Sequence, residues 1–383
     1  MAEQTTSEVP RYITGPEGLR SEEMILNMGP QHPSTHGVLR LVLTLDGETV
    51  VNCTPVIGYL HRGIEKILEN RSYMAGIRYM DNADYLSPML NETAFVGAVE
   101  QLMGLEPPRR AQYIRLLTNE LQRIASHLVA IGTYGLDLGA FTPVLYAFRD
   151  REGIMDMFEA LGGSRFNVNY LRVGGVLHDF PKGWLDQCHK WLDQFEHRSL
   201  PELEALITGN EIFDARTQGV GYIDPRQAIA HGITGPILRA SGVDYDVRRA
   251  EPYSIYDRFE WDVPVRYNGD CFDRYMIRVL EMRQSTRILQ QALDSIPDGD
   301  IRAKMPKVLK PPKGEAYARI EGPKGEIGFY LISDGSPNPY RYNVRPPSFV
   351  NLTCLSQISV GHKLADAVVI LGSFDIVMGE VDR

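Results

Sequence analysis

The chain has 383 residues, of which 43% are hydrophobic and 23% charged, a composition typical of a globular protein with a sizeable core in one large domain or two. Its net charge of -9 and the lack of a long basic run argue against nucleic acid or an anionic lipid surface as a direct partner. No apolar run approaches the ~20 residues of a membrane-spanning helix, and the polar start MAEQTTSEVP is unlike a signal peptide, so we expect a cytoplasmic or equivalent location.

The N-terminal part is predicted to be β-rich. Residues 1–22 are polar, and we expect a flexible arm there. In region 23–60 the stretch VLRLVLTLDGETVVNCTPV alternates apolar and polar residues on either side of an Asp-Gly turn, which predicts a β-hairpin. The segment GPQHPSTHG, which holds His32 and His36, comes directly before this hairpin. We therefore expect the two histidines in a loop that joins strands.

A helical core is predicted for residues 61–303. Pro107-Pro108 is a favourable helix start, and the apolar residues after it recur at alternating spacings of three and four, which predicts a long buried helix. These residues are Ile114, Leu117, Leu121, Ile124, Leu128 and Ile131. A second long helix is predicted from about Asp270 to Leu293, and two further helical stretches lie between them. Packing of helix on helix should form the core.

The C-terminal part is again predicted to be β-rich. Residues 304–314 form a connector rich in proline and lysine, PKVLKPPKG. In region 315–383, EAYARIEGPKGEIGFYLISDG alternates around a Gly-Pro-Lys-Gly turn, and YRYNVRPPSFVNL supplies another strand, interrupted by Pro346-Pro347. The overall prediction is an α+β fold, mainly a helical core bundle, with β-rich N-terminal and C-terminal parts.

The sequence contains no recognisable motif for binding a metal or a nucleotide. Its cysteines lie far apart and form no CxxC pair, so we expect buried, reduced thiols and no metal site. They are Cys53, Cys188, Cys271 and Cys354. The glycines fit neither GxGxxG nor GxxxxGK[ST], which argues against nucleotide binding by this chain.

His32 and His36 have two interpretations. In a turn, an imidazole can cap a backbone group and do nothing more. Alternatively, a loop on a rigid scaffold can aim a histidine into a pocket, where its pKa near neutrality suits it to proton transfer. Metal binding is disfavoured, because a spacing of four suits a metal pair best on a helix and Pro33 opposes a helix there.

Seven blocks of the sequence, in order, resemble one family over residues 23–383. They are MGPQHPSTHGVLRLVL, GYLHRGIEK, NELQRIASHL, LDLGAFTP, NYLRVGGV, LRASGVDYDVRR and the terminal SFDIVMGEVDR. The family is the D-subunit of respiratory complex I, the proton-pumping NADH:quinone oxidoreductase. The resemblance implies a peripheral membrane component of a respiratory-chain translocase, active only within a multisubunit enzyme that couples electron transfer to proton translocation.

That family is similar in fold to the large subunit of nickel-iron hydrogenases, which hold two metals with four cysteines. The second hydrogenase pair would fall on Val377 and Glu380 here, with Ile376 in place of a proline, and the first region, around GYLHRGIEK, contains no cysteine. Because thiolates are the soft ligands such a centre needs, this chain cannot rebuild it. The resemblance implies a quinone headgroup pocket in the vacated space.

Three residues match the family's catalytic positions. The resemblance implies that His36 and Tyr85 donate hydrogen bonds to the quinone, and that Asp137 pairs with the histidine. A phenol is neutral and donates without a buried charge, while an imidazole is a replaceable proton source. Each residue also has a structural alternative, since Tyr85 could be an ordinary core tyrosine and Asp137 an ordinary helix-end residue.

Further positions follow from the same resemblance. Ser87, Asp375, Val377 and Glu380 are expected to line the pocket. Arg62 is expected on the side of an iron-sulfur cluster that a neighbouring subunit carries, and this chain itself holds no cofactor. The structural alternative for Arg62 is an exposed arginine that only forms a salt bridge.

Two departures from the family lie near the expected cluster. Asn82 stands where relatives commonly carry arginine, and Asn167 stands where they often carry histidine. Because both changes remove a cationic or titratable group, we expect the potential of the neighbouring cluster to depend less on pH than in relatives with that histidine. A redox titration of the cluster at several pH values checks this expectation, and a steep slope would contradict it.

The resemblance also implies partners. Electrons must arrive through the cluster-bearing B-subunit, the C- and I-subunits complete the peripheral arm, and the quinone enters from the membrane-embedded H-subunit. The chain would then lie at the cytoplasmic face of the cell membrane, or at the matrix face in an organelle. The sequence leaves open ubiquinone, menaquinone or plastoquinone as substrate.

Three other functions stay open at this point. A true hydrogenase is opposed by the missing cysteine pairs. A divergent structural copy without quinone chemistry is opposed by the presence of His36, Tyr85 and Asp137. The equivalent component of a photosynthetic-type complex that takes electrons from ferredoxin is equally compatible, because this part of the complex does not choose the electron donor.

Overall fold

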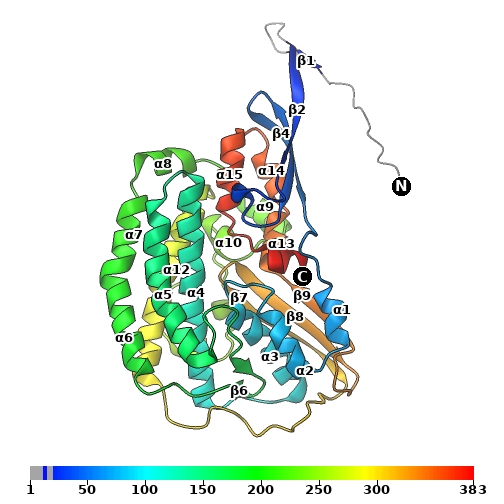
Figure 1. Ribbon diagram of the computed structural model, residues 1–383, viewed down its shortest axis with the longest axis vertical. Coiled ribbons are helices and arrows are strands. Elements are labelled where there is room, and N and C mark those ends of the chain that lie inside the picture. Colours follow the sequence, from blue (N-terminus) through cyan, green and yellow to red (C-terminus); the bar gives the residue numbers. More distant parts are fainter. Residues whose placement is uncertain (1–11, 15–19) are drawn as a thin grey trace.

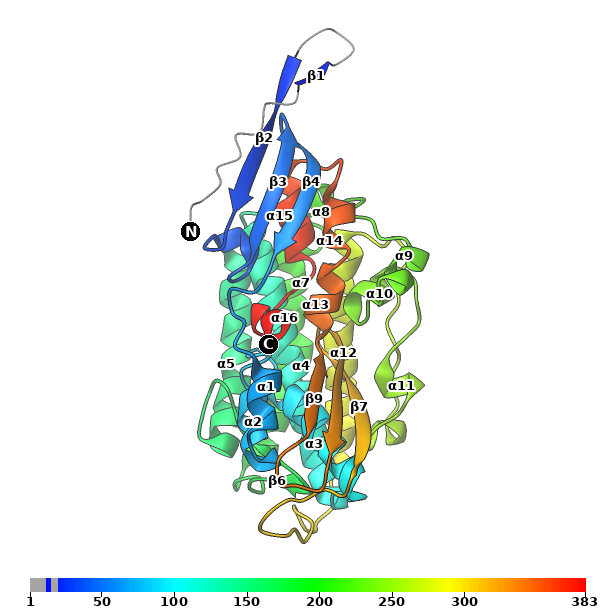
Figure 2. The same cartoon turned by 90° about the vertical axis from the view of Figure 1, so that its right-hand side faces the viewer.

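The computed structural model describes residues 12–14 and 20–383, with side chains from Glu23 onward. The arm expected at residues 1–22 therefore lies largely outside the described residues. Figure 1 shows three neighbouring parts: a helical bundle, an N-terminal sheet, and a second sheet flanked by short helices. The C-terminus lies between the two sheets in both views (Figure 1, Figure 2). This places the terminal motif at the centre of the molecule.

The N-terminal sheet contains the predicted hairpin. Its four antiparallel strands are in the order β1 (Tyr12–Thr14), β2 (Arg20–Met28), β3 (Arg40–Asp46) and β4 (Thr49–Val56). Alternate residues of β3 are buried, as expected for a strand with one face on the core. A single 3-10 turn, η1 (Pro33–Thr35), lies between β2 and β3. The histidine loop thus joins strands, as predicted.

The helical bundle follows the predicted periodicity. It contains α4 (Arg109–Asp137), α5 (Thr142–Gly162), α6 (Trp184–Gln194), the π-helical turn η2 (Phe195–Ser199), α7 (Leu200–Ile207) and α12 (Cys271–Ser295). α4 begins directly after Pro108, and every residue of its predicted apolar stripe is buried. Both long helices occur where the sequence predicts them, because each buries a full apolar face.

Short elements connect the bundle to the rest of the fold. Before α4 come α1 (Ile64–Glu69), α2 (Tyr73–Met80) and α3 (Pro88–Met103). Between α5 and α12 lie β5 (Leu171–Arg172), β6 (Gly175–Val176), α8 (Glu211–Thr217), α9 (Pro225–Ala230), α10 (Pro236–Ala240), α11 (Val247–Ala250) and η3 (Tyr256–Arg258). None of the helices in the described residues is long and apolar enough to cross a membrane.

The second sheet contains β7 (Gly314–Gly322), β8 (Gly325–Ser333) and β9 (Arg341–Arg345), antiparallel and in that order. α3 packs against β7 and β8, and together they enclose a second apolar core. The fold is therefore mixed α+β and mostly helical, with small antiparallel sheets near its two ends, which confirms the predicted class.

The chain after Arg345 differs from the β-rich region expected there. Residues 347–382 form α13 (Pro347–Leu352), α14 (Leu355–Ser359), α15 (Leu364–Gly372) and α16 (Met378–Asp382). Pro346 has no N–H for a strand ladder, and Pro347 occupies the first turn of α13, where a missing N–H costs nothing. The prolines therefore end the strand and start a helix.

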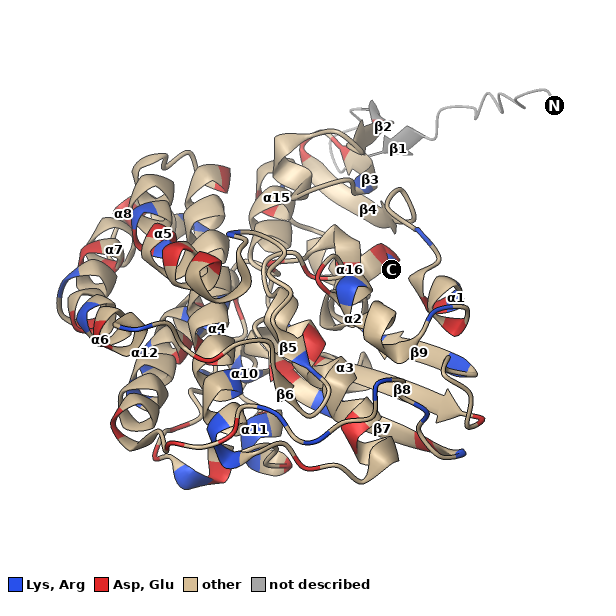
Figure 3. Cartoon of the chain, turned by 60° about the horizontal axis from the view of Figure 1, so that its bottom comes forward, with Lys and Arg blue, Asp and Glu red and all other residues tan. Residues whose placement is uncertain are grey.

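A set of charged side chains is buried where α4, α10, α11, α12 and β7 meet. Figure 3 marks the acidic and basic positions along the ribbon of these elements. Its members are Glu120, Arg123, His127, Arg239, Asp246, Arg248, Glu281 and Glu321. Acids and bases alternate through the set, so that each charge faces an opposite one. We refer to these residues as the buried ion network.

Candidate functional site

His36 and Asp137 meet although 101 residues separate them in the chain. η1 turns the chain back after β2, and His36 ends this turn in the left-handed conformation, with a φ of 50°. Asp137 is the last residue of α4. His36 Nε2 lies 2.7 Å from Asp137 Oδ2, so that the ring N–H donates to the carboxylate. Only 15% of the His36 side chain and 7% of the Asp137 side chain are exposed.

The surroundings of His36 favour its protonated form. Burial by itself lowers the pKa of the ring, but the hydrogen bond to Asp137, the charge of Asp137 and that of Asp375 raise it above its ordinary value. A glycine allows the carboxylate to approach, since a Cβ at Gly372 would collide with Asp137 Oδ2. Because Asp137 occupies Nε2, the ring nitrogen left for another partner is Nδ1.

Tyr85 lies in the loop between α2 and α3, and its neighbours shape that loop. Asp84 Oδ1 accepts from the N–H groups of Leu86 at 3.0 Å and Ser87 at 3.3 Å, and the Ser87 hydroxyl donates to Asp84 Oδ2. Burial, followed by the charge of Asp84, raises the pKa of Tyr85, so the phenol stays neutral. Its hydroxyl makes no hydrogen bond to any of the described residues.

The terminal motif connects these two loops. A Cβ at Gly379 would lie 2.7 Å from the Ala83 carbonyl oxygen, and a Cβ at Gly37 would lie 3.2 Å from Met378. Only glycines at both positions allow α16 to pack against the tyrosine loop on one side and the histidine loop on the other. The motif therefore sets the separation of the two loops.

The pocket-lining residues expected in this motif lie at the same centre. Asp375 adopts the left-handed conformation with a φ of 55°, and Val377 is the N-cap residue of α16. Glu380 Oε1 accepts from the Ser348 N–H at 2.9 Å. Burial and the charge of Asp84 raise the pKa of Glu380 to about 8. Ser87 is fully buried at the start of α3, where it supports Asp84 rather than facing open space.

The three residues expected on the cluster side also lie together. Arg62 Nη2 is 3.4 Å from the Asn82 carbonyl oxygen, to which it donates. Asn167 Nδ2 donates to Asn82 Oδ1 at 3.2 Å. Next to Asn167, the ring of Phe166 is half exposed and has its centroid 6.1 Å from that of Tyr85. This side of the tyrosine loop therefore combines a cation, two amides and an exposed aromatic ring.

Lys324 is a residue of this centre that the sequence did not reveal. It is 1% exposed, and its Nζ lies 3.4 Å from Asp84 Oδ2 and 3.6 Å from Asp375 Oδ2. A lysine in a Gly-Pro-Lys-Gly turn is normally expected at the surface, so the local sequence carries no signal of its burial. Arg278 of α12 is similarly hidden, with Nε 3.9 Å from Asp375 Oδ2.

We next compared the chain with known protein families and proteins. Residues 137–311 and 305–383 match the family described as "Respiratory-chain NADH dehydrogenase, 49 Kd subunit". The D-subunit of the NADH-quinone oxidoreductase of Desulforamulus reducens is 57% identical over 364 residues, covering 95% of this chain and 99% of that protein. The D-subunits of Dehalococcoides mccartyi and Geobacillus thermodenitrificans are 55% and 53% identical, each over 95% of this chain and 100% of the relative. The chain belongs to the D-subunit family of NADH-quinone oxidoreductase.

As a member of the D-subunit family, the protein is one part of a multisubunit enzyme, complex I, and serves respiratory electron transport. The resemblance seen in the sequence is thereby confirmed, and a true hydrogenase is set aside. Within the described part of the chain, no group of three or more His, Cys, Asp or Glu side chains is placed to hold a metal ion. All four cysteines are buried and unpaired.

His32 has a different place from His36 in this member of the D-subunit family. Its Nδ1 accepts from the Ser34 N–H at 3.2 Å, which caps η1. The ring therefore serves the turn, the alternative that the sequence left open for both histidines. Two histidines of one loop thus have separate roles, which makes His32 a natural control for experiments on His36.

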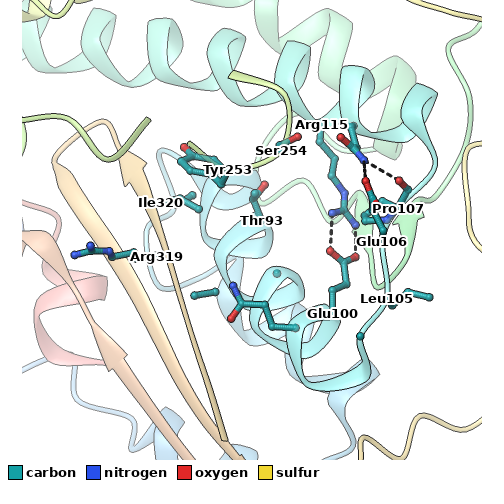
Figure 4. A pocket seen from close by; sticks show the side chains of 15 residues that line it. Thr93, Glu100, Leu105, Glu106, Pro107, Arg115, Tyr253, Ser254, Arg319 and Ile320 are labelled. Atoms are coloured by element: carbon teal, nitrogen blue, oxygen red, sulfur yellow. Dashed lines mark hydrogen bonds and ion pairs between the residues drawn. The ribbon is translucent and has the colours of Figure 1, made fainter. Parts of the chain in front are cut away.

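A cavity of about 400 Å³ lies away from this centre, between α3, the start of α4 and β7 (Figure 4). The ion pair of Arg115 with Glu100, 2.6 Å long, lines it together with Tyr253 and Arg319. Neither His36 nor Tyr85 contributes to its wall. Its Arg115 and Glu100 already pair with each other, so the main charges of its wall are satisfied.

Proposed function

We propose that this protein forms the quinone headgroup site of its complex, with His36 and Tyr85 as the two hydrogen-bond donors and Asp137 as the partner of His36. The observation that supports the proposal is the convergence of the histidine loop, the tyrosine loop and the terminal motif on one another. Within the described residues, neither His36 Nδ1 nor the Tyr85 hydroxyl has a hydrogen-bond partner, which leaves both available as donors.

Quinone reduction adds two electrons and two protons, and negative charge develops on the two carbonyl oxygens. A neutral phenol and a protonated imidazole are suited to donate to these oxygens and then to give up their protons. Once His36 has lost its proton, the Asp137 carboxylate faces a neutral ring in place of a cation. The resulting change in the field at Asp137 would be the first event in coupling to proton translocation.

The electrons are proposed to come from an iron-sulfur cluster held by the neighbouring B-subunit. Exposed apolar side chains beside the proposed donors support a partner there, because Leu136 directly precedes Asp137 and Phe166 lies beside Tyr85. Arg62, Asn82 and Asn167 lie on the same side as Phe166 and would face the cluster. The C- and I-subunits would complete the peripheral arm, and the H-subunit would supply the path of the quinone from the membrane.

The proposal is tested by changing each histidine of the loop in turn. In membranes containing the assembled complex, His36→Gln is expected to lower NADH:quinone reductase activity by roughly tenfold or more, because a general acid is lost. Electron transfer from NADH to an artificial acceptor upstream of the site should persist. His32→Gln, which removes only a cap, should keep quinone reduction within about twofold of the unsubstituted rate. Equal rates for all three proteins would favour a structural copy without quinone chemistry.

Asp137→Asn is expected to shift the pH dependence of quinone reduction. Asp137 raises the pKa of His36, and without its charge the burial of the ring lowers that pKa. His36 then loses its proton at a lower pH, so the alkaline limb of the rate profile should move towards acid. Rates measured from about pH 5.5 to 9, which bracket the ordinary pKa of histidine, check this. A profile that only scales down at every pH would show that Asp137 does not tune the proton donor.

A further inference from the structure

Lys324 occupies an unusual place for its residue type. It lies in the turn between β7 and β8, whose tip packs into the interior. Asn351 Nδ2 donates to the Lys324 carbonyl oxygen at 2.9 Å, and a Cβ at Gly325 would lie 2.5 Å from Thr234 Oγ1. A hairpin tip normally faces water, and the burial of an ammonium is costly unless acids surround it. The position of Lys324 therefore requires an explanation.

The Lys324 ammonium contacts three different elements of the proposed site. Nζ donates to Ser126 Oγ of α4 at 2.7 Å, and it pairs with Asp84 from the tyrosine loop and Asp375 from the terminal motif. The charge of Glu380 on α16 also acts on Lys324. Asp84 precedes Tyr85 directly and shapes its loop, whereas the charge of Asp375 acts on His36. Lys324 thus contacts one acid that directly precedes Tyr85 and another whose charge acts on His36.

We infer that Lys324 is a positioning residue for quinone reduction: it holds the Asp84 and Asp375 turns in place, and its charge stabilises the phenolate that Tyr85 becomes when its proton passes to a quinone oxygen. This inference rests on the proposed function. In that step the Tyr85 O–H bond breaks and a bond from the proton to the quinone oxygen forms, while the electrons come from the iron-sulfur cluster proposed as donor. The surroundings of Tyr85 agree with this role, since burial and the charge of Asp84 raise its pKa whereas the charge of Lys324 lowers it.

The competing explanation is that Lys324 only neutralises buried carboxylates. Around it lie Asp84, Asp375 and Glu380 as acids, and Arg278 is the other cation facing Asp375. If Lys324 is only a neutraliser, its removal from a protein that already lacks the Asp84 charge should cause no further loss of rate. If Lys324 stabilises the developing phenolate, its removal should still lower the rate of Asp84→Asn, because the phenolate then loses its cation.

The experiment therefore compares Lys324→Met, Lys324→Arg and the pair Lys324→Met with Asp84→Asn in membranes containing the assembled complex. Lys324→Met is expected to lower kcat for quinone reduction at least tenfold, to change KM for quinone less than threefold, and to move the alkaline limb of the rate profile to higher pH. The direction follows because loss of a cation makes every nearby acid hold its proton more tightly. Lys324→Arg should restore the profile and most of the rate.

The paired variant decides between the two explanations. Its rate is expected to be at least tenfold below that of Asp84→Asn alone, whereas a rate equal to that of Asp84→Asn would show that Lys324 is only a neutraliser. If the Lys324→Met complex fails to assemble, the paired variant can still be measured, because the pair leaves fewer uncompensated buried charges. Lys310→Met, at an exposed lysine of the connector, is the matched control and should change nothing. Unchanged rates in all Lys324 variants, with a large loss in His36→Gln, would overturn this inference and leave the proposed function standing.

Discussion

Tyr85→Phe is expected to lower quinone reduction by on the order of 10²-fold or more, the largest effect on activity that we expect from a single atom. The phenol hydroxyl is the atom that the substitution removes, and it makes no hydrogen bond to the described residues, so the fold should not depend on it. The ring remains to pack near Phe166. Assembly of the complex and electron transfer from NADH to an upstream artificial acceptor should therefore persist.

The control for this variant is Tyr79→Phe, at a partly buried tyrosine of α2 close to the same loop. It tests whether loss of any phenol hydroxyl in this part of the fold reduces the rate, and it should leave quinone reduction nearly unchanged. A Tyr85→Phe complex that assembles and reduces quinone at the unsubstituted rate would show that Tyr85 is an ordinary core tyrosine. The chemistry would then belong to neighbouring subunits.

Arg239→Met is expected to have the largest effect on stability, because Arg239 is central to the buried ion network. Its guanidinium donates to Glu321 Oε1 at 2.8 Å, pairs with Glu281, and lies 3.5 Å from Asp246 Oδ2. All four side chains are fully buried. Removal of the cation leaves Glu281 and Glu321 without their main cationic partner, while Asp246 keeps Arg248. Breaking such a buried pair costs about 3–5 kcal/mol.

The cost should appear as a fall in the amount of assembled complex in membranes and in the temperature at which quinone reduction is lost. Arg165→Met is the matched control, because Arg165 pairs with Glu152 and Asp156 at the surface. Exposed pairs contribute little, so this variant should assemble normally. Equal amounts and equal heat stability of the Arg239→Met and unsubstituted complexes would mean that the network rearranges around the missing charge.

Much of the fold could be predicted because its signals are local. The alternation around the Asp-Gly turn predicts β3 and β4, and the stripe after Pro108 predicts α4. Three of the four described helices after Arg345, α13, α14 and α16, were harder to predict, since each shows less than two turns of a periodic pattern. Their short apolar runs fit a strand as well as a helix until packing selects one.

The candidate site was likewise predicted only in part from the sequence. Residue types and their order in recognisable blocks were enough to select His36, Tyr85 and Asp137, and the family is confirmed by the relatives. The residues next to Lys324 in the sequence do not predict that it is buried. Nor does the local sequence predict that His32 caps the turn while His36 binds Asp137. Contacts across such distances in the chain depend on how whole elements pack, and no periodic pattern records them.

The sequence by itself therefore determined the class of fold, the main helices and the N-terminal hairpin, the D-subunit family and the lack of the hydrogenase cysteine pairs. Only the tertiary structure decided that the terminal motif lies between the histidine and tyrosine loops, with Lys324 joining their acids. The physical reason is the range of the forces involved. Backbone preferences and apolar periodicity act over a few residues, whereas the pairing of buried charges depends on packing between segments that meet only after the chain has folded.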